Sequence, residues 1–475
     1  MMDTPTFDQC LQVARSGLPH SQAPAQKAIV IGAGMAGLVA ALELIRAGHD
    51  VTVLEASQRL GGRVRTLRAP FTEGLYGEAG AMRIPLGHRL TMAYIHRFGL
   101  PTQPFVTDHP RAFYHFFGRT TRREEEPNEA NGLAGLLGPG TGEADITARW
   151  SRLIRPMIEC LRGAPEDAWT QLLAPYERVS TRQFLTDQGW SEPAIEAFGL
   201  LFNQEALFDN SFAEVLLEEA RDCFSDLVQI PGGMDRLPAA FAPELTGHIR
   251  FGARVIALEQ DSSTVTVRYR IGTDRASISA DRAIVTLPFS VLRFVNVDQP
   301  FSLGKQRAIR ELHYDAATKV FVECQRRFWE EDEGIFGGRS VTDLPIRTIY
   351  YPEHGRETGR GVLLACYTWG EDAERWGALP QSERIALTLE QVAHLHPQVA
   401  KLAAATASAV WGNNSYSIGA FADFSPGQQS RLYPHIVQQE GRYHFAGEHA
   451  SLTHAWIQGA IQSGIRAAWE VRHAP

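Results

Sequence analysis

The sequence predicts an α/β fold, in which a domain built on a parallel sheet is interleaved along the chain with a mixed or antiparallel sheet and with a helical insertion. Three observations predict it. Residues 28–31 have the pattern of a buried strand, followed by a glycine-rich turn, an Ala/Leu-rich helix and a second strand at residues 51–54; this β-α-β unit implies a parallel sheet. Val, Ile and Thr alternate with polar residues again from residue 248 onward. Between these regions, residues 143–226 carry apolar side chains at helical spacing.

The length predicts more than one packed unit. At 475 residues the chain exceeds what one hydrophobic core usually organises, so we expect two or more domains that share one cleft. The parallel-sheet domain is expected to be of Rossmann type. The expected division is residues 27–68, 230–300 and 425–475 for the Rossmann-type domain, residues 1–26, 69–120 and 301–424 for the second domain, and residues 121–229 for the helical domain.

The other elements are justified by local patterns. Residues 7–18 have the apolar spacing of a short amphipathic helix that ends at Gly17, and the polar residues 19–26 are typical of a linker. Residues 119–142 are rich in Arg, Glu, Gly and Pro, which predicts either a mobile loop or a domain junction. Strands expected to complete the Rossmann-type domain are residues 248–258, 264–269 and 283–287. Strands expected to form an antiparallel sheet that roofs a cleft are residues 318–323, 347–351 and 361–369.

Composition and charge exclude several functions. The net charge is −8, whereas nucleic-acid binders concentrate a surplus of Lys and Arg, so we expect small-molecule partners and no nucleic acid. The five cysteines are scattered without a C-x-x-C pair, which argues against a disulfide framework and a zinc site, and no metal is expected. No apolar run is long enough to span a bilayer, and residues 1–26 lack a signal-peptide pattern. We therefore expect a cytoplasmic protein without a membrane anchor.

The glycine-rich turn indicates a dinucleotide site. Gly32, Gly34 and Gly37 form G-x-G-x-x-G between the first strand and the helix, where missing side chains allow a tight turn and bring backbone amides close to a pyrophosphate. Glu55 follows at about the spacing expected for the carboxylate that binds ribose hydroxyls. A turn that serves packing alone is the alternative, but strand, helix, acid and spacing agree. The dinucleotide contacts predicted here are Gly32, Gly34, Met35, Ala36, Gly37, Glu55 and Ala56.

Further segments distinguish FAD from NAD, because the glycine motif alone fits both. Residues 59–63, R-L-G-G-R, resemble the R-x-G-G-R segment of the flavin amine oxidase family. Residues 443–448 and 453–460 resemble the closing FAD-binding motif of that family. The resemblance extends over nearly the whole chain and is closest to the L-amino acid oxidases.

The resemblance implies an FAD site, in which Arg63 neutralises phosphate charge and Glu448 reaches a ribityl or phosphate-side hydroxyl. The amino terminus of the last helix, near Trp456, would stabilise negative charge at the flavin pyrimidine edge. The implied FAD contacts beyond the glycine turn are Gly62, Arg63, Gly80, Ala81, Met82, Arg83, Val255, Glu448, Trp456, Ile457, Gly459 and Ala460.

The resemblance also implies a grip on a substrate carboxylate. Residues 78–85, E-A-G-A-M-R-I-P, resemble the G-x-M-R-x-P signature of the L-amino acid oxidases, which gives the carboxylate-binding role to Arg83. A guanidinium offers two parallel donors that match a carboxylate. A structural bridge between Arg83 and Glu78 or another acid is the alternative. The strand at residues 361–369 resembles one whose tyrosine gives that carboxylate a second hydrogen bond; Tyr367 is the candidate, with a core aromatic as the alternative.

Other implied site residues surround the substrate amine. Trp456 and Phe421 match the two aromatic positions that flank it, although tyrosines are common there, and Ala455 is a further candidate contact. Monoamine oxidases carry a flavin-linked cysteine where this chain has Ala420, so non-covalent FAD is expected. Lys319 matches the family lysine that holds a water beside flavin N5. A strand-edge lysine that faces solvent is the alternative.

The function implied by the resemblance is oxidative deamination of an L-amino acid by FAD. Hydride would pass from Cα to flavin N5, hydrolysis of the imine would give an α-keto acid and ammonia, and oxygen would be reduced to hydrogen peroxide. The expected catalytic residues are Arg83, Tyr367 and Lys319. An amine or polyamine oxidase and a catalytically idle FAD-binding protein are the alternative functions. Quinone or dye acceptors are alternatives to oxygen. The resemblance also suggests a homodimer, which nothing in the sequence itself establishes. Glu205 is a candidate partner for a basic substrate side chain, or else a solvated or helix-capping acid; aromatic and aliphatic substrates remain equally admissible.

Overall fold

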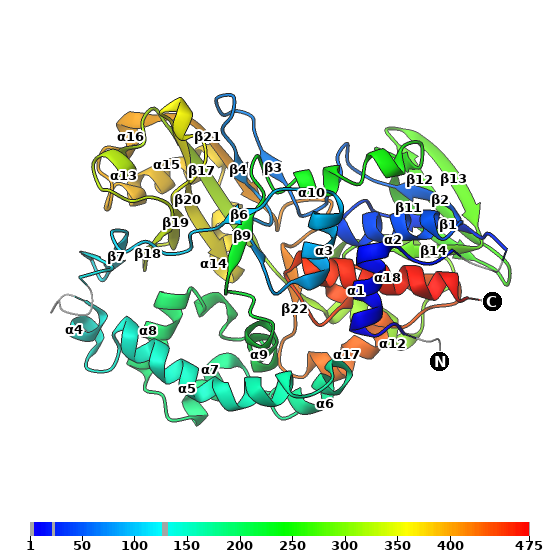
Figure 1. Ribbon diagram of the computed structural model, residues 1–475, viewed down its shortest axis with the longest axis horizontal. Helices are drawn as coiled ribbons and strands as arrows, with labels where there is room; N and C mark the ends of the chain where they lie inside the picture. The colour runs from blue at the N-terminus through cyan, green and yellow to red at the C-terminus, as the bar shows by residue number, and fades with distance from the viewer. Residues whose placement is uncertain (1–3, 21–23, 126–131, 475) are drawn as a thin grey trace.

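The computed structural model describes residues 4–20, 24–125 and 132–474. A five-stranded sheet, at the right in Figure 1, has all its strands parallel, in the order β10-β2-β1-β14-β23. Its central strand is β1 (Lys27–Ile31). Val30 packs into a core on one face of the sheet and Ile29 into a core on the other, as expected for a parallel sheet covered on both sides. The other strands are β2 (Asp50–Leu54), β10 (Ile249–Arg250), β14 (Arg282–Val285) and β23 (Tyr443–Phe445).

Helices cover one face of this sheet. α2 (Met35–Arg46) and α18 (Ile457–Arg472) pack against each other. The contact is close because a glycine lies at it: a Cβ on Gly464 would come within 2.5 Å of the carbonyl oxygen of Ala36. The helix that follows the glycine-rich turn, α2, and the last helix of the chain, α18, thus meet through close contact of their backbones.

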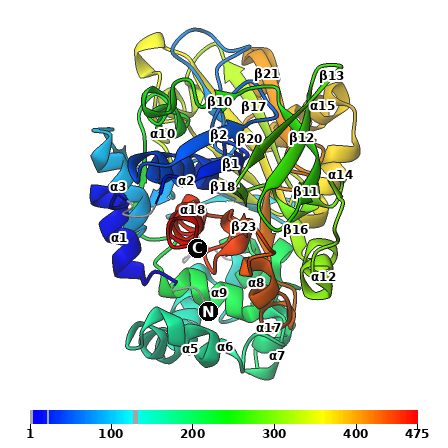
Figure 2. The ribbon, with the colours of Figure 1, turned by 90° about the vertical axis from the view of Figure 1, so that its right-hand side faces the viewer.

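The helix predicted for residues 7–18 is confirmed. α1 (Phe7–Ser16) begins after Thr6, whose side chain forms a capping box with Gln9. α1 packs on α3 (Arg89–Arg97) and on α18, and Figure 2 shows these three helices side by side.

A four-stranded sheet, in the order β13-β12-β11-β15, covers the opposite face of the parallel sheet. The expectation of a single strand at residues 248–258 is wrong. β10 belongs to the parallel sheet and β11 (Arg254–Gln260) to the four-stranded one, because the chain turns between them at Gly252, whose φ is +71°. The strands predicted at residues 264–269 and 283–287 are confirmed as β12 and β14. The remaining strands of this sheet are β12 (Val265–Ile271), β13 (Asp274–Ala280) and β15 (Asn296–Val297).

A seven-stranded sheet, at the upper left in Figure 1, follows the order β21-β17-β20-β19-β18-β7-β8. It is mixed, because β18 pairs with β7 in parallel while the other pairs are antiparallel. The three strands predicted for the cleft roof are confirmed as β17, β19 and β20. The strand bounds are β7 (Phe113–Phe116), β8 (Arg119–Arg122), β17 (Ala317–Cys324), β18 (Arg339–Thr342), β19 (Thr348–Tyr350), β20 (Gly361–Trp369) and β21 (Ala403–Val410).

A helical block lies below both sheets in Figure 1 and has its own core, to which Trp150, Phe198 and Phe212 contribute. The segment predicted as a loop or junction, residues 119–142, contains β8 at its start and α4 near its end. Its residues 126–131 lie outside the described part of the chain, and so do residues 21–23 of the predicted linker. The division into three domains at the boundaries given above stays a prediction. The helices are α4 (Leu133–Leu137), α5 (Glu143–Arg162), α6 (Trp169–Leu173), α7 (Thr181–Asp187), α8 (Glu192–Phe202) and α9 (Phe212–Ala220).

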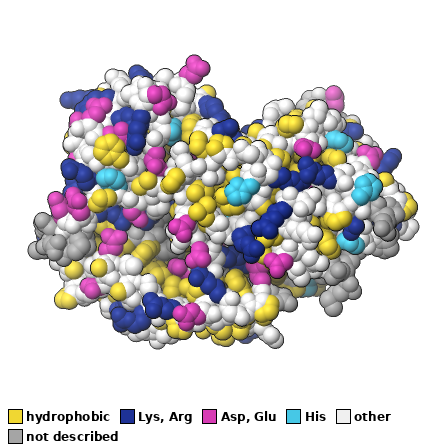
Figure 3. Space-filling model, in the orientation of Figure 1, with side chains coloured by type: hydrophobic (Ala, Val, Ile, Leu, Met, Phe, Trp, Pro, Cys, Tyr) yellow, Lys and Arg dark blue, Asp and Glu magenta, His cyan; other side chains and the backbone are white. Residues whose placement is uncertain are grey.

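Short elements connect these layers. The remaining strands are β3 (Thr66–Leu67), β4 (Gly77–Glu78), β5 (Ile84–Pro85), β6 (Gln103–Pro104), β9 (Leu227–Gln229), β16 (His313–Asp315) and β22 (Phe421–Asp423). The remaining helices are α10 (Arg236–Ala239), α11 (Phe289–Leu292), α12 (Leu303–Glu311), α13 (Phe328–Glu331), α14 (Gly370–Ala378), α15 (Gln381–Val392), α16 (Val399–Leu402) and α17 (Gln428–Val437). Within the described ranges, no helix has the length and apolar character needed to span a membrane. On the face in Figure 3, Lys and Arg side chains are interspersed with Asp and Glu.

Candidate active site

One cavity of about 340 Å³ extends from the parallel sheet to the seven-stranded sheet and the helical block. Leu54 and Thr286, at the carboxyl ends of β2 and β14, line one part of it, and Lys319 of β17 and Glu218 of α9 line another. In open α/β sheets, ligands bind at the carboxyl ends of the strands. The cavity therefore joins a nucleotide-binding edge to a second wall that carries ionisable side chains.

The glycine turn leaves backbone open to this cavity. Gly32 has a φ of +107°, which favours glycine, and it lines the cavity together with Gly34, Met35 and Ala36. Because α2 begins here, its unpaired N–H groups form a site for a phosphate. Gly37 does not line the cavity; a Cβ there would lie 2.0 Å from the carbonyl oxygen of Gly32, so this glycine is required for packing.

Glu55 and Ala56 line the cavity just beyond β2. One carboxylate oxygen of Glu55 accepts the N–H of Ala33 at 2.7 Å, and the other accepts the N–H and the hydroxyl of Ser57 at 2.8 and 2.6 Å. A carboxylate has about four acceptor positions. These contacts fix the group and leave acceptor capacity for a ribose hydroxyl.

The R-L-G-G-R segment contains two arginines with different partners. Arg59 donates to backbone carbonyls of its own loop, including that of Gly62 at 2.5 Å, and so holds the loop in shape. Arg63 donates to Oε1 of Glu448 at 2.7 Å. Burial alone would raise the pKa of Glu448, but Arg63, His454 and His449 together outweigh burial, and the pKa lies below its ordinary value. Arg63 and Glu448, which are far apart in the sequence, thus form one charged pair in the cavity wall.

The amino terminus of α18 also faces the cavity, where Trp456, Ile457 and Ala460 line it. Ala455 lines it too, and its N–H donates to Glu448 at 3.1 Å. Gly459 does not line the cavity. A Cβ on Gly459 would lie 2.1 Å from the nearest backbone carbonyl oxygen, so its role is close packing at the start of the helix.

The remaining predicted cofactor residues, Gly80, Ala81, Met82 and Val255, complete this wall. A Cβ on Gly80 would lie 1.8 Å from the carbonyl oxygen of Arg63, so only glycine fits there. Two helix amino termini, an anchored carboxylate and an arginine thus line one cavity. This set of donors and acceptors fits a flavin dinucleotide.

Lys319 is buried in the opposite wall, with 1% of its surface exposed. Its Nζ donates to the carbonyl oxygens of Glu78 and Gly80 at 2.9 and 2.8 Å. Burial lowers its pKa to about 7; the carboxylate of Glu78 opposes this shift, and Arg83 adds to it. Nζ also lies 3.5 Å from Sδ of Met82. As a neutral amine, Lys319 would give both N–H groups to the carbonyls and keep a lone pair as an acceptor. Because the side chain is buried, the solvent-facing alternative for this lysine is wrong.

Arg83 lines the cavity with no carboxylate at ion-pair distance among the described residues. Its guanidinium donates to the hydroxyl of Tyr350 at 3.0 Å, and its Cζ lies 6.0 and 5.9 Å from the ring centres of Phe105 and Phe224. The alternative bridge to Glu78 is wrong, because that carboxylate accepts hydrogen bonds from other groups. An unpaired cation in a cavity is a binding site for an anion.

Sequence reasoning missed Tyr350 as a partner of Arg83, although it lies in a predicted strand. Burial would raise the pKa of its hydroxyl, but Arg83 and Arg339 outweigh burial and lower the pKa. The hydroxyl thus orients the guanidinium of Arg83 through a hydrogen bond that favours the cation.

Replacing Tyr350 with phenylalanine is expected to raise KM for a carboxylate-bearing substrate about three- to tenfold, because one net hydrogen bond is worth about 0.5–1.5 kcal/mol. The flavin content should be unchanged. Steady-state kinetics of Tyr350→Phe beside Tyr351→Phe, whose hydroxyl bonds Ser340 outside this cavity, check this. An equal change in both variants would contradict the positioning role.

The predicted aromatic residues all line the cavity. The ring of Tyr367 lies 4.5 Å from Nζ of Lys319, and burial raises the pKa of its hydroxyl. Phe421 packs edge-on to Trp369, and Trp456 packs edge-on to Phe224. The structure thus places Tyr367, Phe421 and Trp456 around the same space as Arg83 and Lys319.

Glu205 is placed elsewhere. It does not line the cavity, and its carboxylate is paired with the guanidinium of Arg347. Burial raises the pKa of Glu205, which Arg347 opposes. Because this ion pair already neutralises its charge, Glu205 is not available to recruit a basic substrate side chain. Its side chain is still 31% exposed and lies in the first turn of a short 3-10 helix, Glu205–Leu207.

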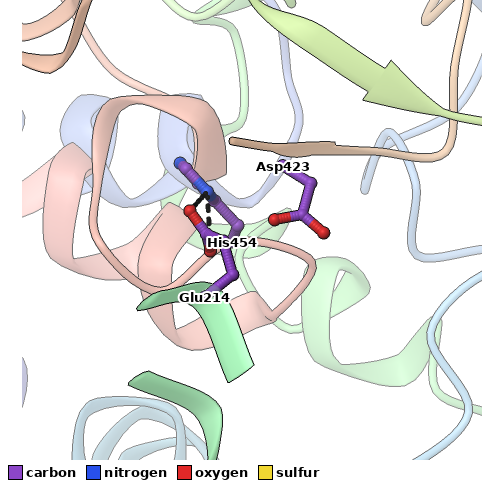
Figure 4. Close-up of side chains that lie close together, drawn as sticks. All are labelled: Glu214, Asp423 and His454. Carbon is purple, nitrogen blue, oxygen red and sulfur yellow. Dashed lines mark hydrogen bonds and ion pairs between the residues drawn. The ribbon is translucent and has the colours of Figure 1, made fainter. Parts of the chain in front are cut away.

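A second group of ionisable side chains in the cavity wall escaped the sequence analysis. Nδ1 of His454 lies 3.1 and 3.3 Å from the two carboxylate oxygens of Glu214, with Asp423 beside them (Figure 4). Burial would lower the pKa of His454, but Glu214 outweighs it and raises the pKa. Asp423 accepts a hydrogen bond from Asn210 at 2.7 Å, and burial raises its pKa well above the ordinary value. This group therefore brings an imidazole and two carboxyl groups together in the cavity wall.

Comparison with known families decides the class of protein. A model of the family described as flavin containing amine oxidoreductase matches residues 35–472. The chain belongs to this family. A flavin cofactor and an oxidoreductase activity on amino groups follow from the family.

This amine oxidoreductase has relatives along nearly its whole length. It is 42% identical over 478 residues to "Putative L-amino-acid oxidase YobN" of Bacillus subtilis (strain 168), with 98% of this chain and 99% of that protein covered. It is 35% identical over 477 residues to the L-amino-acid oxidase of Vipera ammodytes ammodytes, with 98% and 97% covered.

Solved amine oxidases share the fold of this amine oxidoreductase. Putrescine oxidase bound to putrescine superposes with a TM-score of 0.77 at 22% identity, covering 94% of this chain and 99% of that one. Cyclohexylamine oxidase from Brevibacterium oxydans IH-35A superposes with a TM-score of 0.73 at 18% identity, covering 95% of this chain and 98% of that one. The predicted α/β fold is confirmed.

Proposed function

We propose that this amine oxidoreductase is an L-amino acid oxidase that binds FAD without a covalent bond and produces an α-keto acid, ammonia and hydrogen peroxide. The observation that carries the proposal is the unpaired guanidinium of Arg83 in the cavity that contains Lys319 and the nucleotide-binding edge. A monoamine has no carboxylate and would leave this cation without a partner. The full-length likeness to L-amino-acid oxidases supports the same substrate class.

The chain's own residues would bind and orient the substrate. Arg83 would hold the carboxylate with two parallel donors, and Tyr367 would give it another hydrogen bond. Phe421 and Trp456 would flank the amino group. A bound flavin supplies the acceptor for the hydride of the α-carbon. Contacts to the carboxylate and to both sides of the amino group fix the orientation of the substrate. This lowers the free-energy barrier of the reaction, because the orientational entropy has already been lost on binding.

The cavity wall supports non-covalent binding. Ala420 stands at the position of the flavin-linked cysteine of monoamine oxidases, and among the described residues no cysteine lines the cavity. Precipitation with acid should therefore release the yellow cofactor into the supernatant. Cofactor that stays with the protein pellet would contradict this part of the proposal.

A substrate panel tests the activity. Purified protein is assayed for peroxide release with twenty L-amino acids and with tyramine, putrescine and spermidine, and each compound is added anaerobically to follow bleaching of the flavin. We expect L-amino acids to bleach the flavin and to give peroxide in air. Bleaching by amines alone would instead identify an amine or polyamine oxidase, and no bleaching by any compound would identify an idle flavoprotein. Bleaching without peroxide would point to an acceptor other than oxygen.

A further inference from the structure

Glu218 lacks the cation partner that two other cavity carboxylates have. Glu448 is paired with Arg63, and Glu214 with His454. Among the described residues, Glu218 has no cation at ion-pair distance, and its side chain accepts only the indole N–H of Trp456, at 2.8 Å. The cavity thus contains a carboxylate whose charge no cation at ion-pair distance neutralises.

The partner bond also orients Glu218. The indole N–H of Trp456 holds one carboxylate oxygen, so the other is free to accept a hydrogen bond from a ligand in the cavity. Burial raises the pKa of Glu218 to about 7; the hydrogen bond from Trp456 opposes this, the neighbouring acids Glu214 and Glu219 add to it, and Arg83 opposes it. A bound cation would keep Glu218 ionised.

Glu218 and Arg83 lie on different walls of one cavity. Glu218 comes from α9, whereas Arg83 lies just before β5. Phe224 is next to both positions, since its ring centre lies 5.9 Å from Cζ of Arg83 and 5.8 Å from the ring centre of Trp456. Among the described residues, Arg83 has no carboxylate partner and Glu218 has no cation partner at ion-pair distance, so the cavity offers both charges to the same ligand.

The wall around Glu218 is partly apolar. Val215, one turn earlier on α9, and Leu207 also line the cavity. An extended side chain could lay its methylene groups on such a surface and present a charged end to the carboxylate. A neutral side chain would instead displace the water that solvates the carboxylate without supplying an opposite charge. Such desolvation of an unpaired carboxylate is unfavourable.

We propose that Glu218 determines specificity, selecting L-amino acids whose side chain ends in a positive charge, such as a guanidinium or an ammonium. The proposal rests on the proposed function, in which Arg83 holds the α-carboxylate. It replaces the role first expected for Glu205, whose charge Arg347 neutralises. The neutral amino acids would then be the poorer substrates.

L-Arginine and L-citrulline provide the test, because they have nearly the same shape and differ in the charge of the side-chain end. For the native protein we expect kcat/KM for arginine to exceed that for citrulline at least about thirtyfold, as for a desolvated charge pair. In Glu218→Gln this ratio should fall at least about tenfold, with citrulline unchanged or improved. Glu219→Gln is the matched control: this acid is next on α9, bonds Trp150 and does not line the cavity, so its ratio should equal the native one.

Two results would overturn the assignment. If Glu218→Gln lowers kcat/KM for arginine and citrulline by the same factor, the carboxylate acts on the common α-amino group or on folding. If the native protein prefers citrulline or treats both alike, Glu218 does not select charge. Flavin content and melting temperature of each variant identify a folding defect.

A binding measurement separates this proposal from the proposed function. 5-Guanidinopentanoate keeps the carboxylate and guanidinium of arginine but lacks the α-amino group, and 5-ureidopentanoate is its neutral counterpart. Calorimetric titration of the flavin-loaded protein should give a lower Kd for the guanidino compound, and Glu218→Gln should remove the difference. This holds even if no amino acid is oxidised, in which case only the proposed function fails; equal Kd values in the native protein would refute the role of Glu218.

Discussion

Replacing Arg83 with alanine is expected to lower kcat/KM for L-amino acids about 100- to 1,000-fold. The guanidinium has no carboxylate partner among the described residues and is held by Tyr350, so it is ready to bind a substrate carboxylate. Truncating one member of a hydrogen-bonded charge pair costs about 2–5 kcal/mol. Steady-state kinetics over the best substrates of the panel measure the loss.

Control variants separate binding of the carboxylate from general damage. Arg83→Lys keeps the charge but loses the paired donors, so its kcat/KM for L-amino acids should lie between those of Arg83→Ala and the native protein. Arg268→Ala removes an exposed arginine of β12 that does not line the cavity, and should behave as native. Oxidation of an amine without a carboxylate, if measurable, should not decrease in Arg83→Ala. Unchanged kcat/KM for amino acids in Arg83→Ala would remove Arg83 from the substrate site.

Replacing Lys319 with methionine is expected to slow flavin reduction or reoxidation about a hundredfold, with the flavin still bound. The amine is fixed by two carbonyls, and in its neutral form it can accept a hydrogen bond from a water in the cavity. Proton transfer by a positioned side chain contributes about 10²- to 10⁴-fold to a rate. Stopped-flow measurement of each half-reaction identifies the step that depends on it.

A second buried lysine is a matched control for this variant. Lys305 donates to the carbonyls of Ile436 and Gln438 but does not line the cavity. Lys305→Met should lower stability without slowing either half-reaction. If Lys319→Met has native rates in both half-reactions, the role of Lys319 is structural.

The pH dependence of the same step follows from the pKa of Lys319. Burial lowers this pKa to about 7, so the amine is protonated below that pH and neutral above it. Because only the neutral form has a lone pair, the Lys319-dependent step should slow as pH falls through about 7. The activity that remains in Lys319→Met should not show this slowing as pH falls through about 7.

Several features of the site were predictable because neighbouring residues determine them. The turn at Gly32, the start of α2 and Glu55 belong to one strand–turn–helix–strand unit, whose geometry follows from local sequence. Local strand patterns likewise gave β17 and β20, and family likeness pointed to Lys319 and Tyr367. Where one residue redirects the chain, as Gly252 does between β10 and β11, the continuous strand pattern led to a wrong expectation.

Other features depend on residues that meet only in the folded chain. Glu205 was a plausible partner for a basic substrate until Arg347 was found beside it. Tyr350 contacts Arg83, and Glu218 contacts Trp456, across more than 200 residues of sequence in each case. No local pattern indicates such pairs.

The sequence by itself determined the nucleotide-binding edge, the type of sheet and the residue types available for catalysis, because hydrophobic periodicity and glycine positions act over short stretches of chain. The tertiary structure alone decided which charges are neutralised and which face the cavity. Among the described residues, Arg63 and Glu205 have oppositely charged partners, whereas Arg83 and Glu218 have none at ion-pair distance, and this difference arises from the packing of distant segments. Under the proposed function, substrate recognition depends on those charges, since burial makes an uncompensated charge unfavourable until a ligand supplies its partner.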